Sequence, residues 1–260
     1  MDNKVTKKRI TDHLEYDWYK YLIFIIVGIV AIVFTFKQIN RNKNDEDFAI
    51  FFTAYSAREN TYVGDMFGAF DSEDYDEETY GPNIFREMTI EFQNPDANEY
   101  GTLFSTHGQI TSDVVIVRKS YFEDRSEDGK GAGTYRSAFG YLELNDEILK
   151  LLGIDDRTNS QYEFMCVNDK GERVSPSEQG SRIFGVRIDN LSKIGGIAQL
   201  EVKPAEGQEA PESEFFLYIL RDGANIGEYG NKKNKPENKQ TFFCVRKFLE
   251  KYGPALDVAD

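Results

Sequence analysis

The chain has 260 residues, of which 40% are hydrophobic and 29% are charged, and its formal net charge at pH 7 is −14. That charge is unevenly distributed. Residues 1–44 hold eight basic and four acidic side chains, a net of +4, and the remaining 23 basic and 41 acidic residues give −18. Residues 45–260 are acidic enough to repel phosphate, which argues against nucleic-acid binding. They are also numerous enough for one large domain or two small lobes.

The stretch 21–36, YLIFIIVGIVAIVFTF, has no charged residue and predicts a membrane-spanning helix. Sixteen helical residues span about 24 Å, slightly less than a ~30 Å hydrocarbon core, and two aromatic residues before the stretch match the interfacial belt. A core helix would show one polar face, and a cleaved signal peptide would need a small-residue site that 37–41 lacks. The expected uncleaved anchor consists of Trp18, Tyr19, Tyr21, Leu22, Ile23, Phe24, Ile25, Ile26, Val27, Gly28, Ile29, Val30, Ala31, Ile32, Val33, Phe34, Thr35 and Phe36.

The basic residues around this stretch predict its orientation. Five precede it and three follow it, so the positive-inside rule places the N-terminus in the cytoplasm and the larger part of the chain outside the cell. We therefore expect a single-pass protein of the cell membrane. Its predicted parts are a cytoplasmic tail (1–20), a transmembrane helix with interfacial aromatics (18–36), a juxtamembrane linker (37–47), an extracytoplasmic α/β domain (48–253) and a C-terminal tail (254–260).

The first half of the domain alternates between predicted strands and helices. Apolar runs at 48–55, 88–92 and 113–117 predict buried strands, and the intervening stretches 62–70 and 98–108 predict helices. This alternation is typical of parallel βαβ units, whose right-handed crossovers place helices on both faces of an open sheet. The predicted fold class is α/β, with a largely parallel sheet and the first strand between the other two.

Two polar stretches interrupt this pattern, and neither predicts a cofactor site. The acidic segment 71–79 lacks the glycine that an EF-hand loop needs at its sixth position. The glycine-rich segment 123–137 has no GxxxxGK[ST] sequence, and no helical pattern follows its glycines. We expect surface loops, and we predict no cofactor.

The second half predicts shorter elements. Asn145 is a suitable N-cap for a helix at 146–152 that Gly153 ends, and Asn168-Asp169-Lys170-Gly171 predicts a hairpin turn. The other expected elements are strands at 162–167, 172–174, 183–188, 198–202 and 215–220, a flexible lysine-rich stretch at 225–239 and an amphipathic helix at 241–252 with Val245, Phe248 and Leu249 inward.

Several segments resemble a known class of envelope protein. EYDWYKY before the anchor, SDVVIVRKSYFED at 112–124, FGYLELNDEIL at 139–149, and the pair FFLYILRDGANIG and TFFCVRKFLEKYG are similar to single-pass envelope proteins of Gram-positive anaerobes. The extracytoplasmic parts of these proteins look like reduced solute-binding proteins of the type-2 periplasmic-binding fold. The resemblance implies a solute-binding-like domain, with one lobe reduced because this domain is short, and a transporter permease as a partner.

The side chains needed for catalysis or metal binding are sparse. The only histidines are His13, on the expected cytoplasmic side, and His107, and no GxSxG, CxxC or HxxxH spacing is present. We therefore predict neither an enzyme nor a metal site. Cys166 and Cys244 both lie in apolar runs and are expected as buried thiols, with a disulfide as the alternative.

The open-sheet rule predicts that any ligand binds at the carboxyl ends of the parallel strands. The expected ligand-binding residues there are Tyr55, Ser56, Arg58, Asn94 and Arg118, and the two arginines favour a small anionic ligand. The predicted function is a membrane-tethered ligand-binding or sensing module. The alternatives are an interaction subunit of a membrane complex that has lost its ligand and, more remotely, an extracellular hydrolase.

Overall fold

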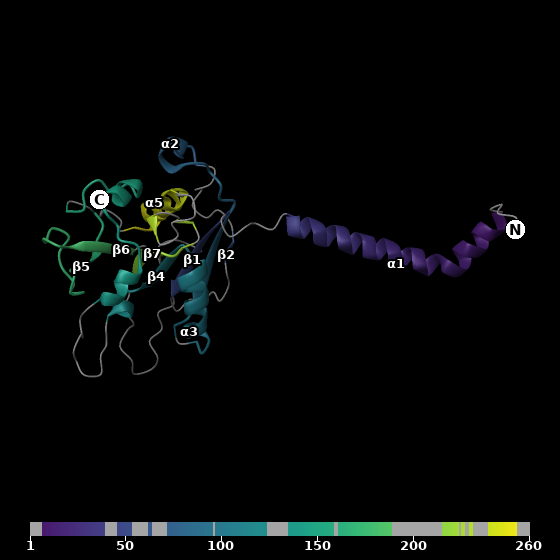
Figure 1. Cartoon of the computed structure of the whole chain (residues 1–260), viewed down its shortest axis with the longest axis horizontal. Helices are drawn as coiled ribbons and strands as arrows, with labels where there is room; N and C mark the ends of the chain where they lie inside the picture. Colours follow the sequence, from purple (N-terminus) through teal and green to yellow (C-terminus); the bar gives the residue numbers. More distant parts are fainter. Residues whose placement is uncertain are drawn as a thin grey trace, which may run out of the picture. The chain divides into compact units, whose positions relative to one another are not determined.

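The structure is a computed structural model, and its chain divides into two compact units, residues 1–43 and 44–260. Each unit is described by itself (Figure 1). The described residues are 7–39, 46–53, 62–63, 72–95, 97–123, 135–158, 161–188, 215–223, 225–226, 229–230 and 239–253.

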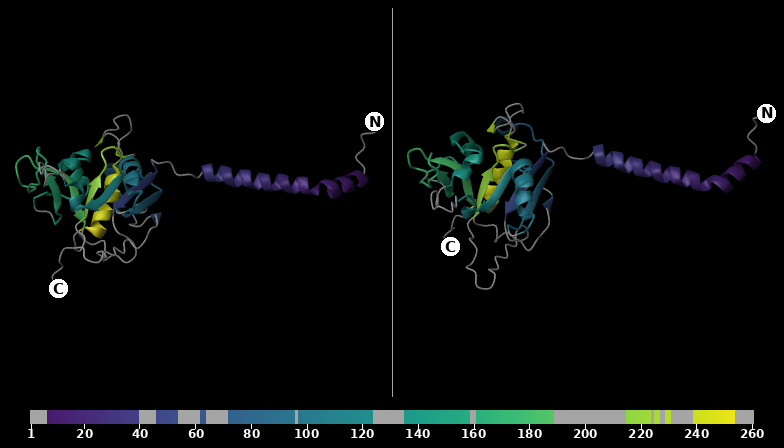
Figure 2. Two further views of the ribbon diagram at one scale, coloured as in Figure 1. Left: turned by 90° about the horizontal axis from the view of Figure 1, so that it is seen from below. Right: turned by 60° about the horizontal axis from the view of Figure 1, so that its bottom comes forward.

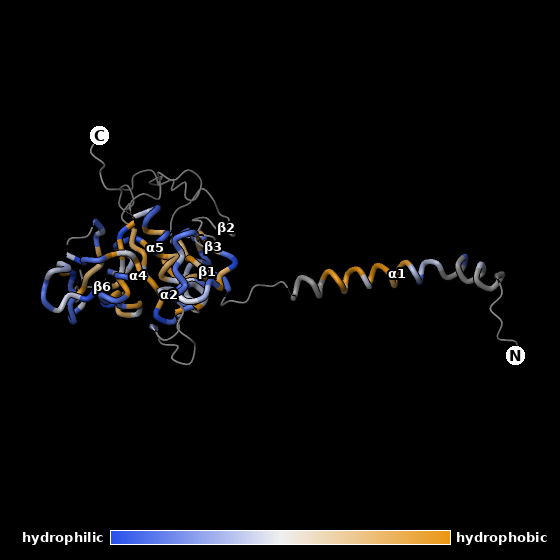
Figure 3. The backbone as a smooth tube through the Cα atoms, turned by 90° about the horizontal axis from the view of Figure 1, so that it is seen from above, coloured by the Kyte–Doolittle hydropathy of each residue, from blue (hydrophilic) through white to orange (hydrophobic). Residues whose placement is uncertain are grey.

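The first unit contains one long helix, α1, which runs from Lys7 to Ile39. The large apolar side chains between Trp18 and Val33 are exposed, and most of this part of the helix is coloured as hydrophobic in Figure 3. The structure describes the side chains of this helix only as far as Val33. Within the described residues, no helix combines the length and the apolar character that crossing a membrane requires.

The second unit is built on a seven-stranded sheet with the order β2-β3-β1-β4-β7-β6-β5. Helices lie on both of its faces, as the two views of Figure 2 show, so the predicted α/β class is confirmed. The strands are β1 (Asp47–Thr53), β2 (Tyr62–Val63), β3 (Glu87–Gln93), β4 (Val114–Arg118), β5 (Phe164–Val167), β6 (Arg182–Ile188) and β7 (Phe215–Ile219).

The three strands of the predicted βαβ region lie side by side. β1 runs parallel to β3 and to β4 and lies between them, with Ile50 opposite Ile90 on one side and Val114 on the other. The expectation of a largely parallel sheet is wrong, however. Of the six pairings among the described strands, four are antiparallel.

The antiparallel part follows from the connections after β4. Residues 168–181 join β5 to β6 through tight turns, in which Gly171 and Gly180 adopt φ of 83° and 81°. A parallel pair would need a crossover connection, usually a helix, and these turns contain none. β7 then lies between β4 and β6, antiparallel to both, with Tyr218 opposite Val115.

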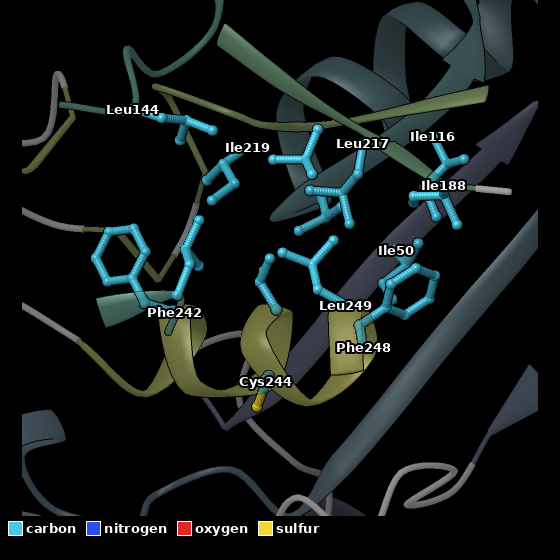
Figure 4. Packing of buried hydrophobic residues seen from close by; sticks show 14 of the residues in the cluster. Ile50, Ile116, Leu144, Ile188, Leu217, Ile219, Phe242, Cys244, Phe248 and Leu249 are labelled. Atoms are coloured by element: carbon cyan, nitrogen blue, oxygen red, sulfur yellow. The ribbon is translucent and has the colours of Figure 1, made fainter. Parts of the chain in front are cut away.

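One face of the sheet is covered by α5 (Gln240–Tyr252), with α2 (Glu77–Tyr80) and α4 (Asp146–Leu151) beside it. The predicted inward side chains Val245, Phe248 and Leu249 are all buried. Figure 4 shows Phe248 and Leu249 directed toward the strands and Cys244 pointing away from them. Both cysteines are free and buried, as the sequence predicted.

The other face is covered by α3 (Tyr100–Leu103) and the π-helix η1 (Phe104–Thr111), followed by the short 3₁₀ turns η2 (Lys119–Phe122) and η3 (Arg136–Gly140). Phe104 packs edge-on against Phe51 of β1, with ring centroids 5.7 Å apart. At Gly108 a Cβ atom would lie 3.0 Å from Phe104 and 3.2 Å from Phe51, so this close approach favours glycine.

Some predicted elements differ from the structure or lie outside its described part. The stretch 62–70 was expected to be a helix, but Tyr62 and Val63 form β2, which pairs with β3, and 64–70 lie outside the described residues. The predicted strand 198–202 lies outside them too, as do most of the two predicted flexible stretches, 123–137 and 225–239.

Candidate functional site

The carboxyl ends of β3, β1 and β4 form one edge of the sheet, where the sequence predicted a ligand site. Asn94 follows β3 and is exposed, and Arg118 ends β4 and is partly buried. β1 separates these two strands, so their ends are roughly 10 Å apart. The other predicted residues, Tyr55, Ser56 and Arg58, lie outside the described residues.

Aromatic side chains fill the described part of this edge. The hydroxyls of Thr53, the last residue of β1, and Tyr100 are 3.1 Å apart, and the Tyr100 ring stacks on Phe104. Tyr121 lies edge-on to Tyr100, with ring centroids 6.3 Å apart. Burial raises the pKa of both tyrosines above the ordinary value, so their hydroxyls stay neutral. Tyr100 and Tyr121 were not predicted, because their chain positions carry no motif.

A cavity of about 390 Å³ lies at the opposite edge of the sheet. The antiparallel register sets Gly185 of β6 opposite Tyr218 of β7, so the start of β6 and the end of β7 meet there. The cavity falls within the range that is typical of small-molecule sites. Its lining residues are Phe139, Tyr141, Leu142, Glu143, Asn145, Ile148, Arg182, Phe184, Arg221 and Tyr229.

The segment 141–144 forms one wall of this cavity by running along the ends of two strands. The amide of Leu142 donates to the carbonyl of Ile219 in β7, at 2.9 Å, and the amide of Leu144 donates to the carbonyl of Ile183 in β6, at 2.7 Å. Asn145 then caps α4 by accepting a hydrogen bond from the amide of Ile148 at 2.9 Å, as the sequence predicted. These bonds fix the backbone that carries the aromatic wall.

Arg182 is held in place by acidic and aromatic neighbours. Its Nη2 and Nε donate to the carboxylate of Glu143 at 2.6 and 2.9 Å, and its Nη1 is 3.9 Å from Asp169. The guanidinium also lies 5.2 Å from the ring centroids of Phe139 and Phe184. Its charge is therefore already compensated, and its role in the cavity is to hold the two rings.

Arg221 differs from Arg182 in its surroundings. It lies after β7, separated from the strand by Leu220, and is exposed at the rim of the cavity. Among the described residues, nothing forms a hydrogen bond or an ion pair with its guanidinium. The hydroxyl of Tyr229, another lining residue, donates to the carboxylate of Glu147 at 3.4 Å. Within the described part of the chain, Arg221 thus gives the cavity a positive charge that no acidic side chain pairs with.

A buried carboxylate anchors the loop that carries Arg221 and Tyr229. Asp113 precedes β4, is fully buried, and accepts hydrogen bonds from the amides of Ala49 and Asn225 at 3.1 and 3.2 Å. The side-chain amide of Asn225 also donates to Asp113, at 3.0 Å, and to the carbonyl of Asp47, at 2.9 Å. Burial raises the pKa of Asp113 from 3.8 to about 7.

The described residues include no group of three or more His, Cys, Asp or Glu side chains arranged to hold a metal ion. His107 is exposed on η1, and its Nδ1 lies 2.7 Å from the carboxylate of Glu91. Burial raises the pKa of the Cys166 thiol to about 11, so it remains protonated and a poor nucleophile.

The cavity could not be predicted from the sequence, because its walls come from segments far apart in the chain. Phe139, Arg182 and Arg221 belong to three such segments, and none lies at the carboxyl end of a parallel strand. The available signal was weak: an arginine that directly follows the strongest late strand, in a domain with many more acids than bases.

Comparison with known proteins gives no relative for this chain: no family model, no curated protein and no solved structure matches it.

Proposed function

We propose that the chain is a non-catalytic, membrane-tethered α/β module that binds a small ligand outside the cell and serves a transport system. In this proposal the domain is solute-binding-like with one lobe reduced, and a membrane permease is the partner. The cavity bounded by Phe139, Phe184 and Arg221 is the observation that carries the ligand-binding part. It combines aromatic side chains with polar and charged side chains, which could orient a small molecule.

The tethering part of the proposal rests on the sequence of 21–36. Sixteen consecutive residues carry no charge, and α1 continues through all of them. The exposed apolar side chains between Trp18 and Val33 are suited to lipid. The greater number of basic residues before this stretch supports a cytoplasmic N-terminus.

The described surface of the second unit supports a ligand-binding module over an interaction subunit. Its exposed large apolar side chains are Ile84, Ile110 and Tyr121. Three such residues spread over separate segments are ordinary for a soluble surface, whereas a protein-binding site usually exposes a contiguous apolar patch.

Thermal-shift screening of the full chain in detergent tests the proposal. The library should contain anionic, cationic and neutral metabolites, together with short peptides. A ligand present at 100 times its dissociation constant stabilises the folded state by roughly 2.7 kcal/mol, which raises the melting temperature measurably. We expect at least one saturable, reversible shift. If no compound shifts the melting temperature and a membrane protein copurifies with the chain, the interaction-subunit alternative replaces this proposal.

A further inference from the structure

We infer that the cavity binds a small aromatic carboxylate, with the carboxylate paired to Arg221 and the ring packed against Phe139. This inference rests on the proposed function and names the ligand class of that site. It also moves the site from the edge predicted by the sequence to the opposite edge of the sheet.

The charge of the ligand follows from the balance of charges in the cavity. Three lining side chains carry a charge: Glu143, Arg182 and Arg221. Glu143 and Arg182 neutralise each other through the 2.6 Å ion pair, which leaves Arg221 as the net charge. A planar guanidinium with its donors available binds a carboxylate through two parallel hydrogen bonds. Repulsion from the acidic domain weakens this attraction, so selectivity depends on the local arginine.

The aromatic character of the ligand follows from the walls. The rings of Phe139 and Phe184 meet edge to face with centroids 5.4 Å apart, and the Tyr141 ring packs against Tyr218 at 5.3 Å. Phe184 and Tyr141 are buried, so the partly exposed ring of Phe139 is the one that another ring can contact. A contact between two rings is worth more than its buried area alone. The Arg182 guanidinium beside both phenylalanines keeps this wall rigid.

The size of the ligand follows from the volume. A 150 Å³ apolar cavity is large enough for benzene. A cavity of about 390 Å³ therefore admits one or two fused rings with a carboxylate attached. An aliphatic acid such as acetate would satisfy Arg221 but leave the exposed part of the Phe139 ring in contact with water, so it should bind more weakly.

The test uses the full chain in detergent and three probes: 2-naphthoate, its neutral isostere 2-naphthamide, and acetate. We expect 2-naphthoate at millimolar concentration to raise the melting temperature, and the other two to have little effect. Arg221→Gln should weaken naphthoate binding by roughly tenfold to a hundredfold, because a hydrogen-bonded charge pair is lost. Arg221→Lys should retain part of the affinity.

Arg86→Gln is the matched control, because Arg86 is an exposed arginine outside the cavity, 3.7 Å from Glu46. It should leave naphthoate binding unchanged. Equal binding of 2-naphthoate and 2-naphthamide, or unchanged affinity in Arg221→Gln, would overturn the inference while leaving the proposed ligand-binding function intact. Absence of naphthoate binding also overturns it, and the proposed function fails as well only if the wider library gives no shift.

Discussion

The buried carboxylate of Asp113 makes wild-type stability depend on pH in a direction opposite to that of most acidic residues. Its pKa is about 7 in the folded protein and 3.8 ordinarily, because burial disfavours the charged form. The folded state therefore holds this proton more tightly than the unfolded state. The resulting stabilisation is complete below pH 3.8 and is lost as the pH rises through 7, a total of roughly 4 kcal/mol.

We expect Asp113→Asn to remove this dependence. Between pH 5 and pH 8, the free energy of unfolding of the wild type should fall by roughly 2–3 kcal/mol relative to the variant. The variant also loses an acceptor for one of the Ala49 and Asn225 donors, at a cost of about 1–3 kcal/mol. That cost is nearly independent of pH, so the change in the difference between the two proteins isolates the titration.

The assay is urea unfolding of the full chain in detergent at pH 5 and pH 8, followed by near-UV circular dichroism of the buried tyrosines. Asp74→Asn is the control, because the ion pair with Lys247 lowers the pKa of Asp74 to about 2, outside this window. Its difference from the wild type should be the same at both pH values. A constant difference for Asp113→Asn as well would refute the reasoning on Asp113.

Four further outcomes are expected. Gly185→Ala should lower the free energy of unfolding by about 1–3 kcal/mol in urea titrations, because its Cβ would lie 2.8 Å from the Tyr218 ring; no loss would mean that the ring moves aside easily. Phe248→Ala should cost about 3–5 kcal/mol, since the side chain is 2% exposed, and a loss below 1 kcal/mol would contradict the packing of α5. Iodoacetamide should modify Cys166 and Cys244 only after unfolding without reductant, and failure to react even then would indicate a disulfide. Protease added to intact cells should remove residues 45–260 and leave the anchor cell-associated, whereas cleavage only after lysis would reverse the proposed orientation.

The three parallel strands of the first half could be predicted because their apolar runs are unambiguous. The run at 48–55 is flanked by polar residues, and its order with 88–92 and 113–117 gave three parallel neighbours. The stripe of Val245, Phe248 and Leu249 likewise identified the buried side of α5. In each case the pattern within one segment was sufficient.

The antiparallel half of the sheet could not be predicted in the same way. All five residues of β7 are buried, so the apolar run that predicts a strand carries no information about its direction or its neighbours. Its position between β4 and β6 depends on contacts between distant segments. The tight turns in 168–181 indicate an antiparallel pair of strands. From the sequence, only the hairpin turn at Asn168–Gly171 was predicted.

The candidate site was harder still, because the sheet rule used to place it concerns parallel strands. That rule selected Asn94 and Arg118, yet the described cavity is formed where β6 begins and β7 ends. Whether an arginine is paired with an acid depends on its neighbours in space, which the sequence does not show. Arg182 pairs with Glu143 in space, and nothing in the sequence distinguishes it from Arg221 in this respect.

Affinity selection of small molecules from a metabolite extract tests the central claim most directly. The full-length wild type and Arg221→Gln, both immobilised in detergent, would be exposed to the same extract, and the retained compounds would be identified by mass spectrometry. We expect the wild type to retain one or more aromatic carboxylates that the variant does not. Retention of the same compounds by both proteins, or of none by either, would contradict an anion-binding cavity at Arg221.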